Sequence, residues 1–387
     1  MNQARTMLLR KRIRPKKTAG TRRRVLPVLP QEIIDMIICS LTRGADWYTL
    51  RNCSLTSRNW LSISRAQLFH SIVLHNEGYL RKVHTLLEKS PHIGNYVRRL
   101  ELNFDDARSS QARMLLNVVF EHLGNVRILA LSGRFPPNGT FRLPRMGSVT
   151  TLVLYRMTCP AIDDLSRLLD SLPNVRVYKI VALSMPTTAT PSQSMSTSAL
   201  APSAHELNIE RCHPITYPFF LSSPLRILSI KVDQEAQLQG FHDAFRTSNA
   251  AETLNTLRLE VWDPTLGCDE GSSQKFKSML GQCPALKHVH FCAYQSISWV
   301  ATLLSCATPD LVTIRVDGFV RHLGELEYLA RVLDHDRYRR LERVDTKLSN
   351  FSLLSNTVSD VDLSTNSFQR VFGSLIKRGK VVMGQGR

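Results

Sequence analysis

Three potential metal ligands occupy alternate positions of one predicted strand. His288, His290 and Cys292 are separated by the apolar residues Val289 and Phe291, so their side chains should point to one face. Imidazole nitrogen and thiolate sulfur are ligands that zinc accepts. Alternate residues on a strand lie roughly 7 Å apart, however, too far to reach one ion at about 2 Å without help from a neighbouring element. The sequence therefore predicts neither a metal site nor a cofactor, and a polar open surface is the simpler interpretation.

The other residues that could do chemistry are few. The chain has no phosphate-binding loop, dinucleotide fingerprint, nucleophile elbow or zinc-protease motif. The carboxylates of Asp163 and Asp164 stand at a predicted helix start, where capping and dipole stabilisation explain them better than acid–base work. Cysteines such as Cys39 and Cys53 are interpreted as small core or interface residues. We therefore expect a binding protein and not an enzyme.

An apolar helix is predicted near the N-terminus, over residues 31–41. Leu29-Pro30 precedes it, and proline at a helix start loses no backbone hydrogen bond. Its isoleucines form two adjacent stripes at four-residue spacing: Ile33, Ile37 and Leu41 in one, Ile34 and Ile38 in the other. Because one stripe is enough for packing within a chain, the second predicts a partner surface.

Two further helices are predicted, over residues 47–53 and 57–68. Three short helices make a poor core by themselves. The segment carries four motifs in chain order: Leu29-Pro30-x-Glu32, Leu50-x-x-Cys53-Ser54-Leu55-x-x-Arg58-x-Trp60, Arg65-x-x-Leu68-Phe69 and Ile72-x-Leu74. Together they resemble the F-box, in the form common among fungal F-box proteins. The resemblance implies a three-helix F-box that docks on a Skp-family adaptor through Leu29, Pro30, Ile33, Ile37, Leu41, Leu50 and Leu55.

The rest of the chain repeats one unit. An apolar residue, two others, an apolar residue, one other and an apolar residue recur ten times, from Val97/Leu100/Leu102 to Leu341/Val344, at intervals of about 21 to 32 residues. Alternation within each unit predicts a short strand, and most units follow a helix-like segment. This α/β pattern resembles leucine-rich repeats, which F-box proteins often carry. Ordinary βαβ units in one twisted sheet are the alternative.

The repeats depart from the regular family pattern. The asparagine or cysteine expected three residues after each strand is matched only by Cys212, and the repeat length varies. We therefore expect an irregular leucine-rich-repeat solenoid. Residues 184–204 interrupt it with a Ser/Thr/Pro-rich composition that predicts a disordered insertion, either a spacer or a phosphorylated segment.

Positive charge is concentrated at the two ends of the chain. The net charge is +18, with ten Lys/Arg in residues 1–24 and five in 363–387, which leaves +3 for the residues between. The first block predicts a disordered arm that serves as a nuclear-import signal, a nucleic-acid contact, a mitochondrial presequence or a plain solvated tail. Nucleic-acid binding is disfavoured because no aromatic residue is interleaved.

These features divide the chain into a basic arm (1–25), an F-box (26–75), a repeat domain (76–350) and a C-terminal tail (351–387). The eight cysteines form no C-x-x-C pair and have no regular spacing, and the sequence shows no secretory signal and no apolar span. These features predict an intracellular protein, in the cytoplasm, the nucleus or both. The resemblance implies a non-catalytic, substrate-recognition subunit of a Skp–cullin–F-box ubiquitin ligase. A scaffold without ubiquitination and a nucleic-acid-associated protein are the alternatives.

The target site is predicted from strand geometry. The residue between the two inward positions of each strand should face the open, concave surface of the solenoid. In the later repeats this position holds Arg258, His290 and Arg315, a potentially cationic stretch. Arginine suits carboxylate or phosphate, so an acidic or phosphorylated target segment is expected there.

Overall fold

The protein divides into two compact units, Met1–Gln67 and Leu68–Arg387, and each is considered by itself. The computed structural model describes residues 29–41, 43–106, 109–136, 143–185, 204–262, 270–320, 323–350, 365–379 and 381–383. The predicted basic arm lies outside these residues. None of the helices in the described ranges has the length and apolarity needed to cross a membrane.

The described part of the N-terminal unit contains three helices, close to the predicted segments: α1 (Gln31–Ser40), α2 (Arg43–Thr56) and α3 (Arg58–Phe69). Pro30 begins α1, and its carbonyl accepts from the backbone N–H of Ile33 at 3.1 Å. The Ser57 hydroxyl accepts from the Trp60 N–H at 3.3 Å, as expected of a cap on α3. A three-helix segment is therefore present where the sequence predicted one.

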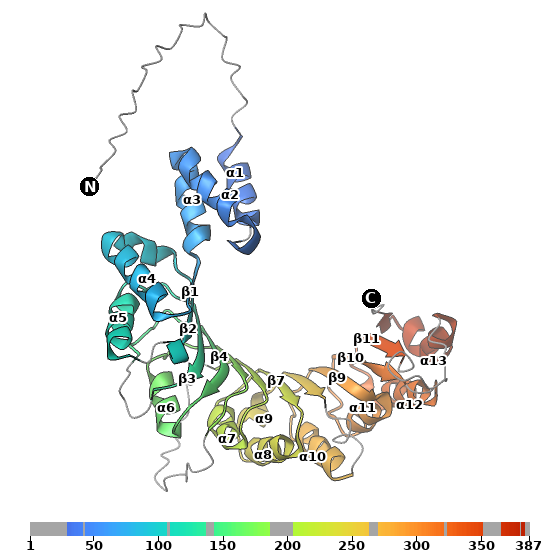
Figure 1. Cartoon of the computed structure of the whole chain (residues 1–387). Helices are drawn as coiled ribbons and strands as arrows, with labels where there is room; N and C mark the ends of the chain where they lie inside the picture. The colour runs from blue at the N-terminus through green and yellow to red at the C-terminus, as the bar shows by residue number, and fades with distance from the viewer. Residues whose placement is uncertain are drawn as a thin grey trace, which may run out of the picture. The chain divides into compact units, whose positions relative to one another are not determined.

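The second unit is built on one sheet of twelve parallel strands that follow chain order (Figure 1). The strands are β1 (Ser71–Leu74), β2 (Arg99–Asn103), β3 (Ile128–Arg134), β4 (Thr151–Thr158), β5 (Val177–Val181), β6 (Glu206–Glu210), β7 (Ile227–Val232), β8 (Thr256–Val261), β9 (His288–Ser296), β10 (Thr313–Val320), β11 (Arg343–Asn350) and β12 (Val381–Met383). Strictly sequential order is the arrangement of a repeat solenoid, in which each unit contacts its neighbours.

Helices cover one face of this sheet (Figure 1). They are α4 (Glu77–Lys89), α5 (Ser110–Glu121), α6 (Ile162–Asp170), α7 (Tyr217–Leu221), α8 (Glu235–Arg246), α9 (Ala250–Thr253), α10 (Glu270–Gly281), α11 (Ile297–Leu304), α12 (Leu323–Asp334) and α13 (Thr365–Lys377). We call the opposite face the open face. One-sided helices and sequential strands match the predicted leucine-rich-repeat architecture and not the alternative of ordinary βαβ units with helices on both faces.

The core is a stack of aligned apolar side chains between sheet and helices. Each strand from β2 to β10 contributes the two inward residues that the repeat pattern predicted, and the register places equivalent residues side by side. Leu129, for example, pairs with Leu100 on one side and with Leu152 on the other, and all three are fully buried. The apolar pattern of the sequence therefore sets both the burial and the register of the strands.

The backbone at the ends of four strands shows how the solenoid is held together without a regular asparagine ladder. Gly133, Arg156, Ala182 and Arg211 occupy equivalent places in four successive repeats, and all have positive φ, between 48° and 81°. Backbone groups then join successive turns: Ala182 N–H donates to the Glu210 carbonyl at 2.7 Å, and His213 N–H donates to the Leu183 carbonyl at 2.9 Å. Backbone hydrogen bonds thus satisfy groups that side-chain amides satisfy in regular repeats.

Three boundaries differ from those predicted. The sheet begins at β1, inside the segment that the sequence assigned to the F-box, because Ile72 and Leu74 pack against the repeats. It continues beyond residue 350 through α13 and β12, so the predicted C-terminal tail includes a further repeat. At the predicted insertion, Met185 and Ala204 are both buried, so the packed structure extends into both ends of residues 184–204.

Candidate functional site

Helix α1 presents one apolar stripe to the core and another to the surface. Ile34 and Ile38 are 8% and 1% exposed, whereas Ile33 and Ile37 are 41% and 50% exposed. Met36, on the same side as the second pair, is also exposed. We call Ile33, Met36 and Ile37 the exposed α1 stripe. The division into two stripes is the one that the isoleucine spacing predicted.

The N-terminal unit is rich in exposed apolar side chains. Among the described residues, twelve large apolar side chains are exposed, and seven of them lie between residues 29 and 55: Leu29, Ile33, Met36, Ile37, Trp47, Tyr48 and Leu55. Such a concentration in so short a segment indicates an interaction surface.

The predicted adaptor-binding residues do not all lie on the surface. Leu29, Pro30 and Leu55 are exposed, and Leu41 is half-buried. Leu50 is fully buried, unlike the other predicted adaptor-binding residues. It is a core residue of the unit, as Ile34 and Ile38 are, so its contribution to binding would be through folding of the helices.

The strand register confirms the row predicted along the open face. Arg258 pairs with His290 across β8 and β9, and His290 pairs with Arg315 across β9 and β10. The guanidinium side chains of Arg258 and Arg315 are about half exposed, at 48% and 49%. The three predicted target-binding residues are therefore neighbours.

The charge of this row differs from the prediction. Arg315 donates to both carboxylate oxygens of Asp317 at 3.1 Å, and Arg258 lies 3.7 Å from the Glu260 carboxylate. The same arrangement, arginine followed two residues later by an acid on the same face, joins Arg343 to Asp345 at 2.8 Å. Each of these three arginines has an acidic neighbour, so the row is charge-paired and less cationic than predicted.

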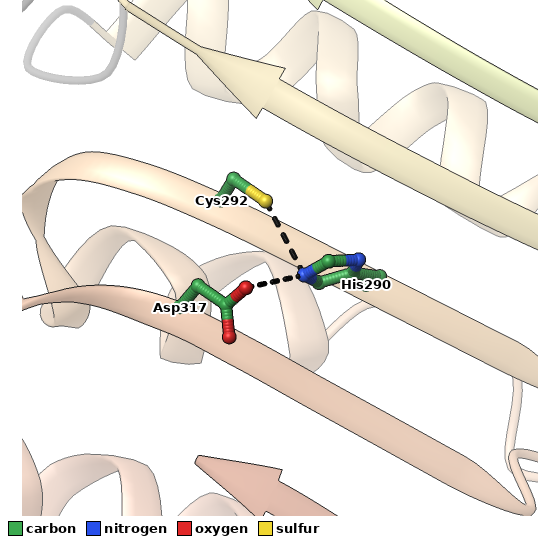
Figure 2. Close-up of side chains that lie close together, drawn as sticks. All are labelled: His290, Cys292 and Asp317. Carbon is green, nitrogen blue, oxygen red and sulfur yellow. Dashed lines mark hydrogen bonds and ion pairs between the residues drawn. The ribbon is translucent and has the colours of Figure 1, made fainter. Parts of the chain in front are cut away.

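A compact cluster lies inside this row (Figure 2). His290 Nε2 is 2.9 Å from Asp317 Oδ2 and 3.2 Å from Cys292 Sγ. The register pairs Asp317 with Cys292 across β10 and β9. His288, which the sequence grouped with His290 and Cys292, is not among the three; Asp317 of the next strand takes the third position.

Burial and hydrogen bonding set the protonation of the cluster. Burial lowers the pKa of His290 below its usual value, although Asp317 opposes this. Burial acts to raise the pKa of Asp317, but hydrogen bonds from Arg315 and His290 outweigh it and hold that pKa low. Burial also raises the pKa of the Cys292 thiol, against the effect of Arg258. At neutral pH the cluster therefore holds a neutral imidazole, a carboxylate and a thiol.

A second feature of the open face lies in the first repeats and was not anticipated. A hollow of about 370 Å³ is lined by residues of β1 to β4, including Glu101, Asn103, Ala130, Ser132 and Tyr155. Its cause is the small size of Ala130 and Ser132 between longer neighbours. The sequence signal was the run of small residues at the open-face positions of β3.

The adjacent carboxylates of Asp163 and Asp164 stabilise helix α6. Asp163 and Asp164 lie in its first turn, as predicted, and Asp164 pairs with Arg167 at 2.5 Å. Burial raises the pKa of Asp164, and Arg167 opposes that effect. Ala161 occupies the N-cap without a side-chain hydrogen bond, so the predicted stabilisation comes from the position of the acids near the helix dipole.

No protein-family model matches the chain, and no curated protein matches it in sequence. Among solved structures, it is similar to the leucine-rich repeat-containing protein LegL7 from Legionella pneumophila, with 14% identity and a TM-score of 0.44 over 81% of this chain and 90% of that one. It is also similar to a chain of the TLR13–ssRNA13 complex (14%, TM-score 0.33, 68% of this chain and 45% of that one) and to human 5T4, trophoblast glycoprotein (17%, 0.31, 66% and 88%). All three TM-scores are below 0.5, so the repeat architecture of this chain rests on its own strand order and helix placement.

Proposed function

We propose that this protein is a substrate-recognition subunit of a Skp–cullin–F-box ubiquitin ligase. The N-terminal helices bind a Skp-family adaptor, and through it a cullin, while the repeats hold a target protein. The chain performs no chemistry in this role, because a separately bound conjugating enzyme supplies the ubiquitin.

The exposed α1 stripe carries this proposal. It combines the F-box-like motifs of the sequence with an apolar surface on the helix that those motifs define. A partner helix or groove of apolar character would cover Ile33, Met36 and Ile37 and remove their surface from water. The repeat unit supports the second half of the proposal, because Arg258, His290 and Arg315 are aligned in register on the open face, and the helices cover the opposite face of the sheet (Figure 1).

Reconstitution of the ligase tests the proposal. The purified full-length chain, mixed with a Skp-type adaptor and a cullin, should elute with both in one size-exclusion peak, and the cullin should elute separately when the adaptor is omitted. A scaffold without a role in ubiquitination would bind the adaptor but leave the cullin unbound. An adaptor that elutes separately from the chain contradicts the F-box assignment.

The target is proposed to bind the open face of the later repeats. Arg258→Glu with Arg315→Glu would place four acids around His290, and we expect target proteins to be lost from affinity purifications while the adaptor is retained. Arg99→Glu is the matched control, because Arg99 forms the same kind of pair, with Glu101 at 2.7 Å, in the first repeats. Quantitative mass spectrometry of the three purifications gives the answer. Loss of targets with Arg99→Glu alone would place the target in the hollow between β1 and β4 instead.

The nucleic-acid alternative depends on the basic arm. Binding by that arm would weaken steeply with salt, because phosphate contacts release counterions. The described open face offers no comparable cationic surface, since acids stand beside its arginines.

A further inference from the structure

We propose that His290, Cys292 and Asp317 form a binding site for a divalent transition metal of the zinc type. The three donor atoms lie within 4.8 Å of one another, and the histidine nitrogen faces the cysteine sulfur on one side and the aspartate carboxylate on the other (Figure 2). The proposal is independent of the adaptor-binding role.

The spacing of the donors suits one ion. Zinc lies about 2.0–2.2 Å from nitrogen and oxygen ligands and about 2.3 Å from sulfur, so tetrahedral ligands stand roughly 3.3–3.6 Å from one another. The Nε2–Oδ2 and Nε2–Sγ separations are 2.9 and 3.2 Å. For these two pairs, an outward movement of a few tenths of an ångström, within the reach of side-chain torsions, would reach the tetrahedral spacing. The third pair, sulfur and carboxylate oxygen, lies within 4.8 Å.

The geometry does not suit the competing interpretation, an activated cysteine nucleophile. In a thiol–imidazole–carboxylate relay, the carboxylate contacts one ring nitrogen and the thiol contacts the other. Here Cys292 and Asp317 both contact Nε2 of His290. When Nε2–H donates to Asp317, the same nitrogen has no lone pair for the thiol proton, so the relay cannot operate. Convergence of three donors on one point is instead what a shared cation requires.

The two arginines beside the cluster would assist metal binding: Arg315 would orient the aspartate ligand, and Arg258 would stabilise the thiolate form of the cysteine ligand. Arg315 holds both oxygens of Asp317, which is the kind of second interaction that fixes a ligating carboxylate. Arg258 Nη2 lies 3.9 Å from Cys292 Sγ and favours the thiolate. Metal binding would release the thiol proton to solvent and would require the imidazole proton to stand on Nδ1, so that the Nε2 lone pair is free for the ion. The thiolate and carboxylate would then balance the two positive charges of the ion.

The donor set indicates which metal would bind. One sulfur, one nitrogen and one oxygen favour zinc or a similar borderline ion over magnesium or calcium, which prefer oxygen alone. The side chains of His290 and Asp317 are 17% and 23% exposed, so solvent reaches the cluster from the open face. Three protein ligands leave a fourth position, which water or a side chain of a bound protein would fill.

Cobalt(II) substitution of the full-length protein tests the site. Loading the metal-free protein with Co²⁺ should produce a sulfur-to-cobalt charge-transfer band, and Zn²⁺ should displace it. Cys292→Ser should abolish the band, and Asp317→Asn and His290→Asn should weaken Co²⁺ binding by at least about tenfold. His288→Ala and Cys306→Ser are the matched controls: His288 shares the strand and its face, and Cys306 is an exposed thiol.

A thermal measurement keeps the proposal testable if a variant folds poorly. Zn²⁺ should raise the unfolding temperature of the wild type and of His288→Ala but not that of Cys292→Ser. A cobalt band that survives Cys292→Ser, or its absence from the wild type, overturns the proposal.

Discussion

Replacing Ile33 and Ile37 together with aspartate is expected to weaken binding to a Skp-type adaptor by more than about 100-fold. Burial of an unpaired charge in an apolar contact costs about 3 kcal/mol or more, and each 1.4 kcal/mol is tenfold in Kd. Both side chains point away from the core of the N-terminal unit, so the helices should keep their fold. Titration of the purified adaptor by isothermal calorimetry measures the loss.

The expected effect is large because the apolar area available for binding is small. Leu29, Ile33, Met36, Ile37 and Leu55 are between 41% and 77% exposed. Their complete burial would contribute roughly 4 to 9 kcal/mol, against an association cost of about 4 to 15 kcal/mol. No single contact is therefore dispensable.

Cys39→Asp is the matched control for this experiment. Cys39 is exposed and is therefore not the core residue that the sequence suggested. At 100° per residue it lies roughly 120° or more around the helix from Ile33 and Ile37, so it is expected to stand outside the contact that they make. This variant should bind the adaptor like the wild type and have the same circular dichroism spectrum. Equal binding by the double variant and by Cys39→Asp would remove the exposed α1 stripe from the interface.

Leu152→Ala should be among the most destabilising single truncations in the repeats, at about 2 to 5 kcal/mol. The side chain is fully buried, and in the register it stands between Leu129 and Tyr178. A solenoid has few ways to close the resulting cavity, because the strands on both sides are fixed by their own neighbours. The midpoint of urea unfolding gives the measurement.

Val153→Ala removes two methyl groups from the next residue of the same strand, which faces the hollow on the open face. It should cost about 1 kcal/mol or less, as expected for a side chain that is only half-buried. If Val153→Ala were as destabilising as Leu152→Ala, the assignment of inward and outward positions in β4 would be reversed.

The repeating apolar pattern of the sequence predicted ten of the twelve strands and the row of neighbours along the open face. That success has a physical basis, because two buried positions per strand fix both the face and the register. β12 was missed because Val381 to Met383 is too short to show the full pattern. α8 was also missed, although Leu238, Phe241 and Phe245 have helical spacing and are buried.

The candidate sites were predicted less completely than the fold. The buried state of Leu50 depends on how three helices pack, which spacing along one helix does not determine. The Asp317 contribution to the cluster depends on strand pairing, and the same alignment that placed His290 beside Arg315 would have placed Asp317 beside Cys292. The charge pairing of the later row was visible as arginine followed two residues later by an acid, as in Arg258 and Glu260.

The burial of Met185 and Ala204 makes one point of the solenoid tolerant of changes in chain length. β5 and β6 pair in uninterrupted register, from Val177 with Glu206 to Val181 with Glu210, although 18 residues separate Met185 from Ala204. Doubling the length of a flexible connection costs only about 0.6 kcal/mol in closure entropy. Insertions and deletions at this point would therefore be nearly neutral for stability, and related proteins could differ greatly in length here while the repeats on both sides stay in place.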